Sequence, residues 1–506
     1  MRRKLLVLTL SILWSAGLLL IPALAQDEAT APPGEGTEEA IIEETAVEEA
    51  VVDEPVEVAP LEEATAVDEE AAAVEEAAEE TAPTAAEEDP VVINKVALDT
   101  VWVLLAGVLV MFMQAGFAML EAGFCRAKNA VNLLMKNMLD FCFAAIMYWA
   151  VGFAIMFGAG NLLFGTSGFF LHDPTGMTFA SLDWTSVPLE AKYFFQLVFC
   201  ATAATIVAGA VAERAKFTAY IAYSIIISAV IYPIIGHWIW GGGWLGGLGM
   251  LDFAGSTVVH STGGWLSLTA AVVLGPRLGK YDADGNAKAF PGHNIPLAAL
   301  GGFILWFGWF GFNAGSTMEA LALDIAHIVT TTNLSAGAGG IAAMFASWWM
   351  FGKPDASMTI NGALAGLVAI TAPCAFVSAG SAVWIGLIGG VLVVLAVVFI
   401  DKVLKIDDPV GAIAVHGING AWGTLAVGIF ASDGGLLFGG GWSLLGVQAL
   451  GVVSVFAFAM ASGFLLFYTI NSLIGMRVSK EEELRGVDIE EHGMEAYHGF
   501  QIFTTE

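Results

Sequence analysis

The chain has 506 residues, of which 57% are hydrophobic and only 13% are charged, and its mean hydropathy is +0.74. Soluble domains carry roughly 25% charged residues, so this composition excludes a soluble globular protein and indicates a polytopic membrane protein. The net charge of −30 comes mostly from residues 27–90, which hold 24 Asp and Glu and no Lys or Arg. The remainder is only mildly acidic, which argues against a nucleic-acid partner.

The first predicted element is an N-terminal leader over residues 1–25. It has a basic start, an apolar run and a small-residue ending, ALA, which is the pattern of a secretory signal peptide cleaved after Ala25. A retained membrane anchor is the alternative. In either case the following segment starts outside the cytoplasm.

The second element, residues 26–92, is rich in Glu, Ala, Val, Thr and Pro. Such a segment cannot bury enough apolar surface to fold, so we expect a disordered acidic stretch on the extracellular or periplasmic side, acting as a solvated linker. A second hypothesis is that its charge concentrates cations at the outer mouth of the protein. Screening within about 8 Å at physiological salt makes this effect small.

Residues 93–476 contain eleven apolar runs, each near the ~20 residues that a bilayer requires. The predicted cores are 97–120, 134–158, 191–212, 217–240, 253–275, 294–314, 325–350, 359–378, 382–401, 409–430 and 444–474. The predicted fold class is therefore an all-α polytopic membrane protein with eleven transmembrane helices. The abundant glycines among these runs are typical of closely packed membrane helices.

The positions of Lys and Arg predict the orientation. With the mature N-terminus outside, only Lys95 and Lys192 of the mature chain fall on the outer side. This positive-inside asymmetry predicts a multi-pass cell-membrane protein. An odd number of spans places the C-terminal segment, residues 477–506, in the cytoplasm.

The four cysteines give no evidence of a metal or a disulfide framework. All lie in or beside apolar runs, and no pair has zinc-ligand spacing, so we expect small buried hydrophobic side chains and no cofactor. The four are Cys125, Cys142, Cys200 and Cys374.

Two of the predicted spans contain polar residues and share a sequence pattern. The fifth contains VVHSTGGW (258–265) and the tenth contains AVHGINGAW (414–422), so each has Val-His followed by Gly four residues after the His. Both follow an acidic residue, Asp252 or Asp408. Spans that are five apart run in opposite directions, which indicates an inverted repeat of spans 1–5 and 6–10, with the eleventh span added.

His260 and His416 would face each other across the axis of this repeat. A histidine inside a span is by default a candidate functional residue, although both could instead be packing residues bonded to backbone carbonyls. Two imidazoles without nearby Asp, Glu or Cys ligands make a poor zinc or iron site. A neutral pair can share one hydrogen bond and offer its other nitrogens to a guest no larger than water.

Aromatic residues gather at the expected outer ends of three spans: Trp240 on the fourth, Phe195 and Phe199 on the third, and Phe312 on the sixth, which also carries Ser316. An interfacial anchoring belt is the simpler interpretation. Their position beside glycine runs and a hydroxyl favours a vestibule for a small monovalent cation, because each aromatic face attracts cations by ~0.5–2 kcal/mol.

These residues lie in motifs that resemble those of the ammonium transporters of the Amt/Mep/Rh superfamily, in particular bacterial Amt-type proteins. The matching motifs are GAVAERAKF (209–217), WGGGWL (240–245), DFAGSTVVH (252–260), GWFGFNAGS (308–316), DDPVGAIAVHG (407–417) and RVSKEEELRGVDIEEHGMEAYH (477–498). The resemblance covers most of residues 95–500 and does not extend to the acidic segment.

The resemblance implies an eleven-helix fold around a pseudo-two-fold axis, assembled as a homotrimer with one pore per subunit. It implies an outer ammonium site at Trp240, Ser316 and Phe199, and a phenyl gate at Phe199 and Phe312. The pore lining also includes Phe195, Trp309 and the twin histidines, His260 and His416.

The resemblance also gives roles to Asp252 and to the C-terminal tail. Asp252 matches an acid required near ammonium recruitment, although at the start of its span it could equally be a helix cap. The tail matches a regulatory segment that docks on the cytoplasmic face, where PII-type proteins act. The residues that carry this match are Gly486, Asp488, His492, Gly493 and Tyr497.

The predicted function is transport of ammonium or ammonia across the lipid bilayer, with ammonium recruited at the aromatic site, deprotonated, and ammonia conducted past the histidines. Two alternatives remain: a neutral-gas channel of the Rh kind, and an ammonium sensor with little transport. No paired catalytic constellation accompanies the histidines, so we expect no enzymatic activity.

Overall fold

The computed structural model describes residues 89–497. The expected signal peptide, nearly all of the acidic segment and residues 498–506 lie outside the described residues. Within residues 89–497 the regular structure is helical, accompanied only by isolated bridges.

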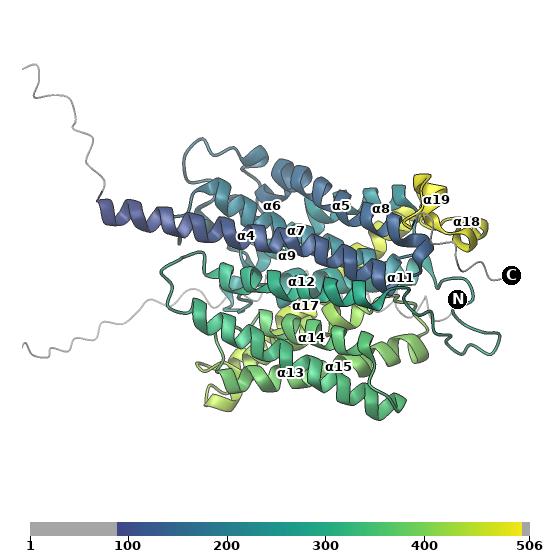
Figure 1. Ribbon diagram of the computed structural model, residues 1–506. Helices are drawn as coiled ribbons and strands as arrows, with labels where there is room; N and C mark the ends of the chain where they lie inside the picture. Colours follow the sequence, from purple (N-terminus) through teal and green to yellow (C-terminus); the bar gives the residue numbers. More distant parts are fainter. Residues whose placement is uncertain (1–88, 498–506) are drawn as a thin grey trace, which may run out of the picture. The chain divides into compact units, whose positions relative to one another are not determined.

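Eleven apolar helical segments are found in the described part of the chain, one for each predicted run (Figure 1). Ten are long enough to cross a bilayer, and α14 is shorter. The segments are α4 (Pro90–Phe124), α5 with η2 and α6 (Ala130–Met147, Tyr148–Gly152, Phe153–Phe157), α7 (Leu189–Val211), α8 with η5 and α9 (Phe217–Ile226, Ile227–Ile231, Tyr232–Ile239), η6 with α11 (Ser256–Ser261, Thr262–Leu274), α12 (Ile295–Ala314), α13 (Ile325–Phe351), α14 (Ala356–Thr371), α15 with η8 (Ala379–Val398, Phe399–Leu404), η9 with α16 (Ile413–Ile418, Asn419–Phe430) and α17 (Ser443–Leu473).

The first helix begins earlier than the composition suggested. Asp89 accepts a hydrogen bond from the backbone nitrogen of Val91 at 2.9 Å, and Pro90 occupies the first helical position, where its missing N–H costs nothing. Residues 90–92, assigned above to the acidic segment, therefore belong to α4.

Glycines bring the helices into backbone contact, as expected for membrane packing. A methyl group added at Gly366 on α14 would overlap the carbonyl oxygen of Ser335 on α13, and one added at Gly390 on α15 would overlap that of Gly339. Small residues therefore hold α13, α14 and α15 at close approach.

Many apolar side chains point out of the bundle. Met138, Ile146 and Trp149 on the second segment are exposed, and so is Cys142 between them. The expectation that all four cysteines are buried is therefore wrong for Cys142, because it lies on the outward, lipid-compatible side of its helix. Cys125, Cys200 and Cys374 are buried as expected.

Two short helices follow the last span, α18 (Lys480–Arg485) and α19 (Val487–His492), and pack against one end of the bundle, beside α5 and α8 (Figure 1). We call this end the tail face and the opposite end the distal face. The tail face contains a buried ion cluster. Arg277 donates two side-chain hydrogen bonds to Asp407 at 2.9 Å each and lies 3.3 Å from Glu213, which also pairs with Arg126.

The ion cluster joins the ends of the two histidine-bearing segments. Asp407 precedes η9, and Arg277 follows α11, so η9–α16 leaves the tail face where η6–α11 reaches it. Although burial opposes ionisation, the guanidinium groups of Arg277 and Arg126 hold the pKa of Glu213 below its ordinary value. Hydrogen bonds from Arg277 and the charge of Arg214 outweigh burial at Asp407 and lower its pKa to about 2.

Candidate functional site

The two histidine-bearing segments start with the same capping arrangement. The Asp252 carboxylate accepts hydrogen bonds from the backbone nitrogens of Gly255, Thr257 and Val258 at 2.9–3.0 Å. Asp252 therefore acts as a helix cap, as one of the two interpretations of this residue predicted.

Asp408 repeats this arrangement on the tail side. It accepts hydrogen bonds from the backbone nitrogens of Gly411, Ala412 and Ile413 at 2.8–3.1 Å. Gly255 and Gly411 each lie three residues after the acid and have positive φ angles of 113° and 82°. The repeated cap, positive-φ glycine and antiparallel direction agree with the predicted inverted repeat.

The capped turns place His260 and His416 against each other in the centre of the bundle. Their Nδ1 atoms are 3.2 Å apart and their rings are 5.3 Å apart at an interplanar angle of 24°. Both side chains are buried, and each Nδ1 bonds the other ring rather than a backbone carbonyl. Gly264 permits this approach, because a methyl group there would overlap the backbone nitrogen of Gly417.

Aromatic rings continue from His260 towards the distal face. Phe312 stacks on His260 at 5.3 Å, Phe199 contacts Phe312 at 4.1 Å, and Trp240 lies edge-on to Phe199 at 6.2 Å, all measured between ring centroids. The two phenylalanines are fully buried, whereas Trp240 is half-buried. A continuous column of rings therefore leads to the histidine pair from the half-buried region around Trp240 and Ser316 on the distal face, which we call the distal mouth.

Two further predicted pore residues support this column from the side. Phe195 contacts the Phe199 ring at 4.7 Å, one helical turn away on α7. Trp309 stacks on His260 at 4.9 Å with an interplanar angle of 19°, and its Nε1 donates to Thr371 Oγ1 at 2.8 Å. Trp309 is buried and covers one face of the His260 ring, so it holds that ring in its orientation.

The distal mouth also brings together the polar residues expected there. Trp240 Nε1 donates to the backbone oxygen of Asp252 at 2.7 Å, and Ser316 Oγ donates to the backbone oxygen of Phe312 at 2.8 Å. Ser316 and Trp240 are both half-buried. The predicted recruitment residues thus share one region, held in place by backbone hydrogen bonds.

His260 and its surroundings retain unused hydrogen-bonding capacity. Among the described residues, His260 Nε2 and the nearby Ser261 hydroxyl are buried without a hydrogen-bond partner. A small molecule that donates or accepts hydrogen bonds could satisfy such atoms. The structure gives no corresponding support for a metal, since no three His, Cys, Asp or Glu side chains gather at ligand distance within residues 89–497.

A family model described as Ammonium Transporter Family matches residues 101–497, which include every residue of this column. The chain belongs to the ammonium transporter family. It is 52% identical to ammonium transporter Amt2 of Archaeoglobus fulgidus over 432 residues, covering 81% of this chain and 90% of that protein.

Solved structures agree with this membership. The chain superimposes on a sensor Amt protein with a TM-score of 0.73 and 42% identity, covering 79% of this chain and 99% of the other. It also superimposes on Mep2 of Candida albicans with a TM-score of 0.70 and 31% identity, covering 76% and 87%.

Two residues of this ammonium transporter continue the column of rings towards the tail face, and the sequence analysis did not identify them. Phe117 on α4 lies 6.1 Å from His416 between ring centroids, and Glu121, one turn further, is 2% exposed. Because α4 is apolar almost throughout, no periodicity distinguished its inner side from its outer side.

The predicted tail residues hold α19 against the spans. The Asp488 carboxylate accepts hydrogen bonds from the backbone nitrogens of Val131 and Asn132 at 3.0 and 2.9 Å. These donors belong to the first turn of α5, whose own N-cap side chain makes no such bond. His492 Nε2 lies 3.0 Å from the Asn132 side-chain nitrogen and packs edge-on against Phe217.

Glu491 contributes a second helix cap that the motif did not identify. Its carboxylate accepts a hydrogen bond from the backbone nitrogen of Phe217, the first residue of α8, at 2.6 Å. The two predicted glycines act through the backbone: Gly486 has φ 112° where a methyl group would crowd Lys128, and Gly493 ends α19 with φ 66°.

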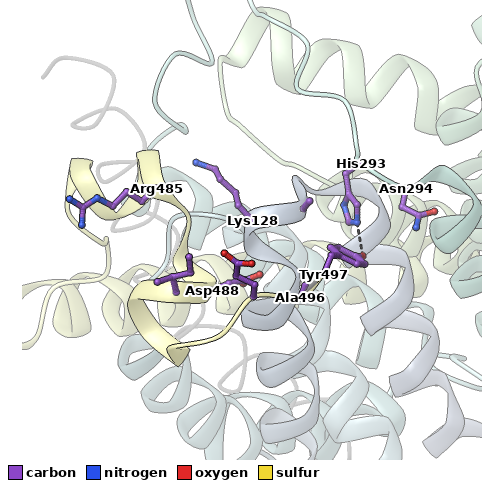
Figure 2. A pocket seen from close by; sticks show the side chains of 10 residues that line it. Lys128, His293, Asn294, Arg485, Asp488, Ala496 and Tyr497 are labelled. Carbon is purple, nitrogen blue, oxygen red and sulfur yellow. Dashed lines mark hydrogen bonds between the residues drawn. The ribbon is translucent and has the colours of Figure 1, made fainter. Parts of the chain in front are cut away.

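Tyr497, the last predicted tail residue, closes one end of a pocket of about 580 Å³ on the tail face. Its hydroxyl is 2.7 Å from Nε2 of His293, whose Nδ1 bonds the backbone oxygen of Cys125. Figure 2 shows this bond, with the Arg485 side chain at the other end of the pocket. The tail thus rests on the loops that connect the spans.

Proposed function

We propose that this protein transports ammonium nitrogen across a cell membrane, with ammonium captured at the distal mouth and ammonia passing the histidine pair. The observation that carries the proposal is the column of rings from Trp240 through Phe199 and Phe312 to His260 and His416. Family membership and the relatives named as ammonium transporters support it.

Capture takes place at the half-buried residues of the distal mouth. The faces of Trp240 and Phe199 attract a cation by ~0.5–2 kcal/mol each, and the Ser316 hydroxyl can accept a hydrogen bond from ammonium. Asp252 orders the backbone beneath Trp240, and its negative charge favours a cation in the mouth.

Ammonium then gives a proton to water on the distal side, before ammonia enters the buried Phe199–Phe312 pair. A unit charge in an apolar environment costs several kcal/mol or more, whereas neutral ammonia carries no such penalty. The two tilted phenyl rings in contact therefore favour passage of ammonia. His260 Nε2, which has no protein partner in the described structure, replaces a hydrogen bond that ammonia loses on leaving water.

Assembly and regulation complete the proposal. We infer a homotrimer with one pore per subunit, because this is the arrangement implied by the family pattern. The tail face would lie in the cytoplasm, where its Lys and Arg residues follow the positive-inside rule. A PII-type protein would act there on the tail, which already contacts the ends of α5 and α8.

The test measures ammonium flux and electrical current together in proteoliposomes containing the wild type or His260→Ala. We expect the wild type to move ammonium and the variant to lose flux or selectivity for ammonium over potassium. A wild type that moves no ammonium, or a variant that matches the wild type in both measurements, would overturn the proposal.

A second candidate function is ammonium sensing, favoured by the similarity to the structure titled a sensor Amt protein. It predicts saturable ammonium binding to the wild type without turnover in the same proteoliposomes.

A neutral-gas channel predicts flux that follows the ammonia concentration alone, insensitive to substitution of Trp240.

A further inference from the structure

A small cavity lies between His416 and the tail face. It has a volume of about 20 Å³, and a cavity needs roughly 10–15 Å³ to hold one water molecule, so one molecule the size of water or ammonia fits. Its lining includes His416, Phe117, Glu121 and Asn361. A guest that passes the histidine pair enters this space next.

The cavity wall carries a carboxyl group in an unusual setting. Glu121 is 2% exposed, and its Oε2 accepts a hydrogen bond from Asn137 Nδ2 at 2.9 Å. Within the described residues it forms no ion pair with Lys or Arg. A buried carboxylate without a counter-ion is costly unless it is protonated or paired with a cation.

A second acceptor lines the same cavity. Asn361 is 5% exposed, and its Nδ2 donates to the backbone oxygen of Val410 at 3.0 Å. Its Oδ1 is buried without a hydrogen-bond partner in the described structure. The cavity is thus lined by a carboxyl group and an amide oxygen, which suit a guest that donates several hydrogen bonds.

We propose that Glu121 is the proton donor that converts ammonia back to ammonium after it has passed the histidine pair. This inference rests on the proposed transport function and adds a residue to it. The protonated carboxyl gives its proton to the ammonia nitrogen: the O–H bond breaks as the N–H bond forms. The products are ammonium and the Glu121 carboxylate, held as an ion pair, with the Asn361 amide oxygen accepting a further hydrogen bond.

The cycle closes on the tail side. Ammonium leaves to water, and the carboxylate takes up a proton from hydronium in that water, so each turnover consumes one proton from the tail side. The titratable groups that surround Glu121 come from several elements: Lys136 and Asp140 on α5, Cys125 after α4, Tyr220 and Tyr223 on α8, and His416 on η9. Lys136 donates to the backbone oxygen of Ala215 at 3.1 Å, and Asp140 accepts from Tyr220, so both already have partners.

The test compares wild type, Glu121→Gln and Asp140→Asn in oriented proteoliposomes, with tail orientation established by protease access. Glu121→Gln keeps the size and the hydrogen-bonding capacity of the side chain but cannot donate a proton to ammonia. General acid–base groups contribute typically 10²–10⁴-fold, so we expect maximal ammonium uptake to fall about tenfold or more. The half-saturating concentration at the distal mouth should stay within about twofold of wild type, because the recruitment residues are unchanged.

Dependence on tail-side pH separates proton donation from a structural role. Wild type and Asp140→Asn, a matched carboxyl-to-amide change in the same buried region, should both lose uptake as tail-side pH rises. Glu121→Gln should be slow and insensitive to that pH. If Glu121→Gln is recovered folded and transports like the wild type with the same pH profile, the proposal is wrong.

Asn361→Leu gives a second route if Glu121→Gln does not fold. It removes the unpartnered acceptor while leaving Glu121 in place, and we expect reduced maximal uptake with a retained pH profile. Unchanged uptake in Asn361→Leu would contradict the proposed cavity site. Failure of the wild type to move ammonium would instead refute the transport function itself, so the two failures are distinguishable.

Discussion

The Nδ1 atoms of His260 and His416 lie 3.2 Å apart, so one ring must donate and the other accept a single shared hydrogen bond. Each ring thereby fixes the tautomer of the other, and His260 Nε2 is left without a hydrogen-bond partner among the described residues. The pair acts as one unit built from two halves of an inverted repeat.

Because the two histidines act as a unit, their substitutions should not be additive. We expect His260→Ala, His416→Ala and the double variant to show similar losses of ammonium flux. Flux measured in proteoliposomes, normalised to the amount of inserted protein, checks this. Losses that multiply in the double variant would show that each ring acts alone.

Trp240 contributes both an aromatic face and an indole N–H bonded to the Asp252 backbone. Trp240→Leu removes both, so the half-saturating ammonium concentration should rise about 2- to 30-fold, corresponding to ~0.5–2 kcal/mol. Trp240→Phe keeps the aromatic face and should show a smaller rise. Equal effects of the two substitutions would contradict a cation–π contribution.

Asp252 and Asp408 form a matched pair for testing capping against charge. An asparagine at either position has one acceptor oxygen fewer, and its side-chain N–H group points towards backbone donors. We therefore expect Asp252→Asn and Asp408→Asn each to lower the free energy of unfolding by about 1 kcal/mol. Asp252→Asn should in addition raise the half-saturating ammonium concentration, because Asp252 lies at the distal mouth. If both variants change affinity equally, Asp252 acts only as a cap.

Arg277 pairs with two buried carboxylates, and Arg277→Met would leave Asp407 without its salt-bridge partner, whereas Glu213 would keep Arg126. Removing one partner from a buried ion pair costs about 3–5 kcal/mol, so the variant should be markedly less heat-stable in detergent at pH 7. Arg277→Lys retains the charge without the two-pronged geometry and should be intermediate.

The same cluster predicts a pH dependence with a defined sign. The pKa of Asp407 is lowered to about 2 in the folded protein, against about 3.9 when unfolded. The contribution of Asp407 to the free energy of unfolding is therefore fully present above pH 4 and is lost as the pH falls towards 2. Wild-type thermal stability should decline over that window, and Arg277→Met should decline less steeply. Parallel profiles would contradict this assignment.

Asp488 caps α5 from the tail, so Asp488→Ala leaves two backbone N–H groups without their partner. We expect the tail to undock more often, with faster protease cleavage after residue 477 and increased amide hydrogen exchange in α19. Glu490→Ala, on the same helix and paired in the described part of the chain with the exposed Arg485, is the control and should leave both rates unchanged.

The sequence by itself determined the eleven spans, because runs of about 20 apolar residues have few other stable environments. It also determined the repeat, since Asp252 and Asp408 each lie eight residues before a histidine. The family motifs then indicated which aromatic and tail residues to examine.

Only the tertiary structure decided which side chains meet. Phe117 and Glu121 are separated by almost 300 residues from His416, and nothing in their uniformly apolar surroundings marked them as lining the same cavity. The tail's role as a cap for α5 and α8 likewise depends on backbone groups, which carry no residue-specific signal. Hydrophobicity places helices in a membrane, but close packing through small residues sets which faces of those helices line the pore.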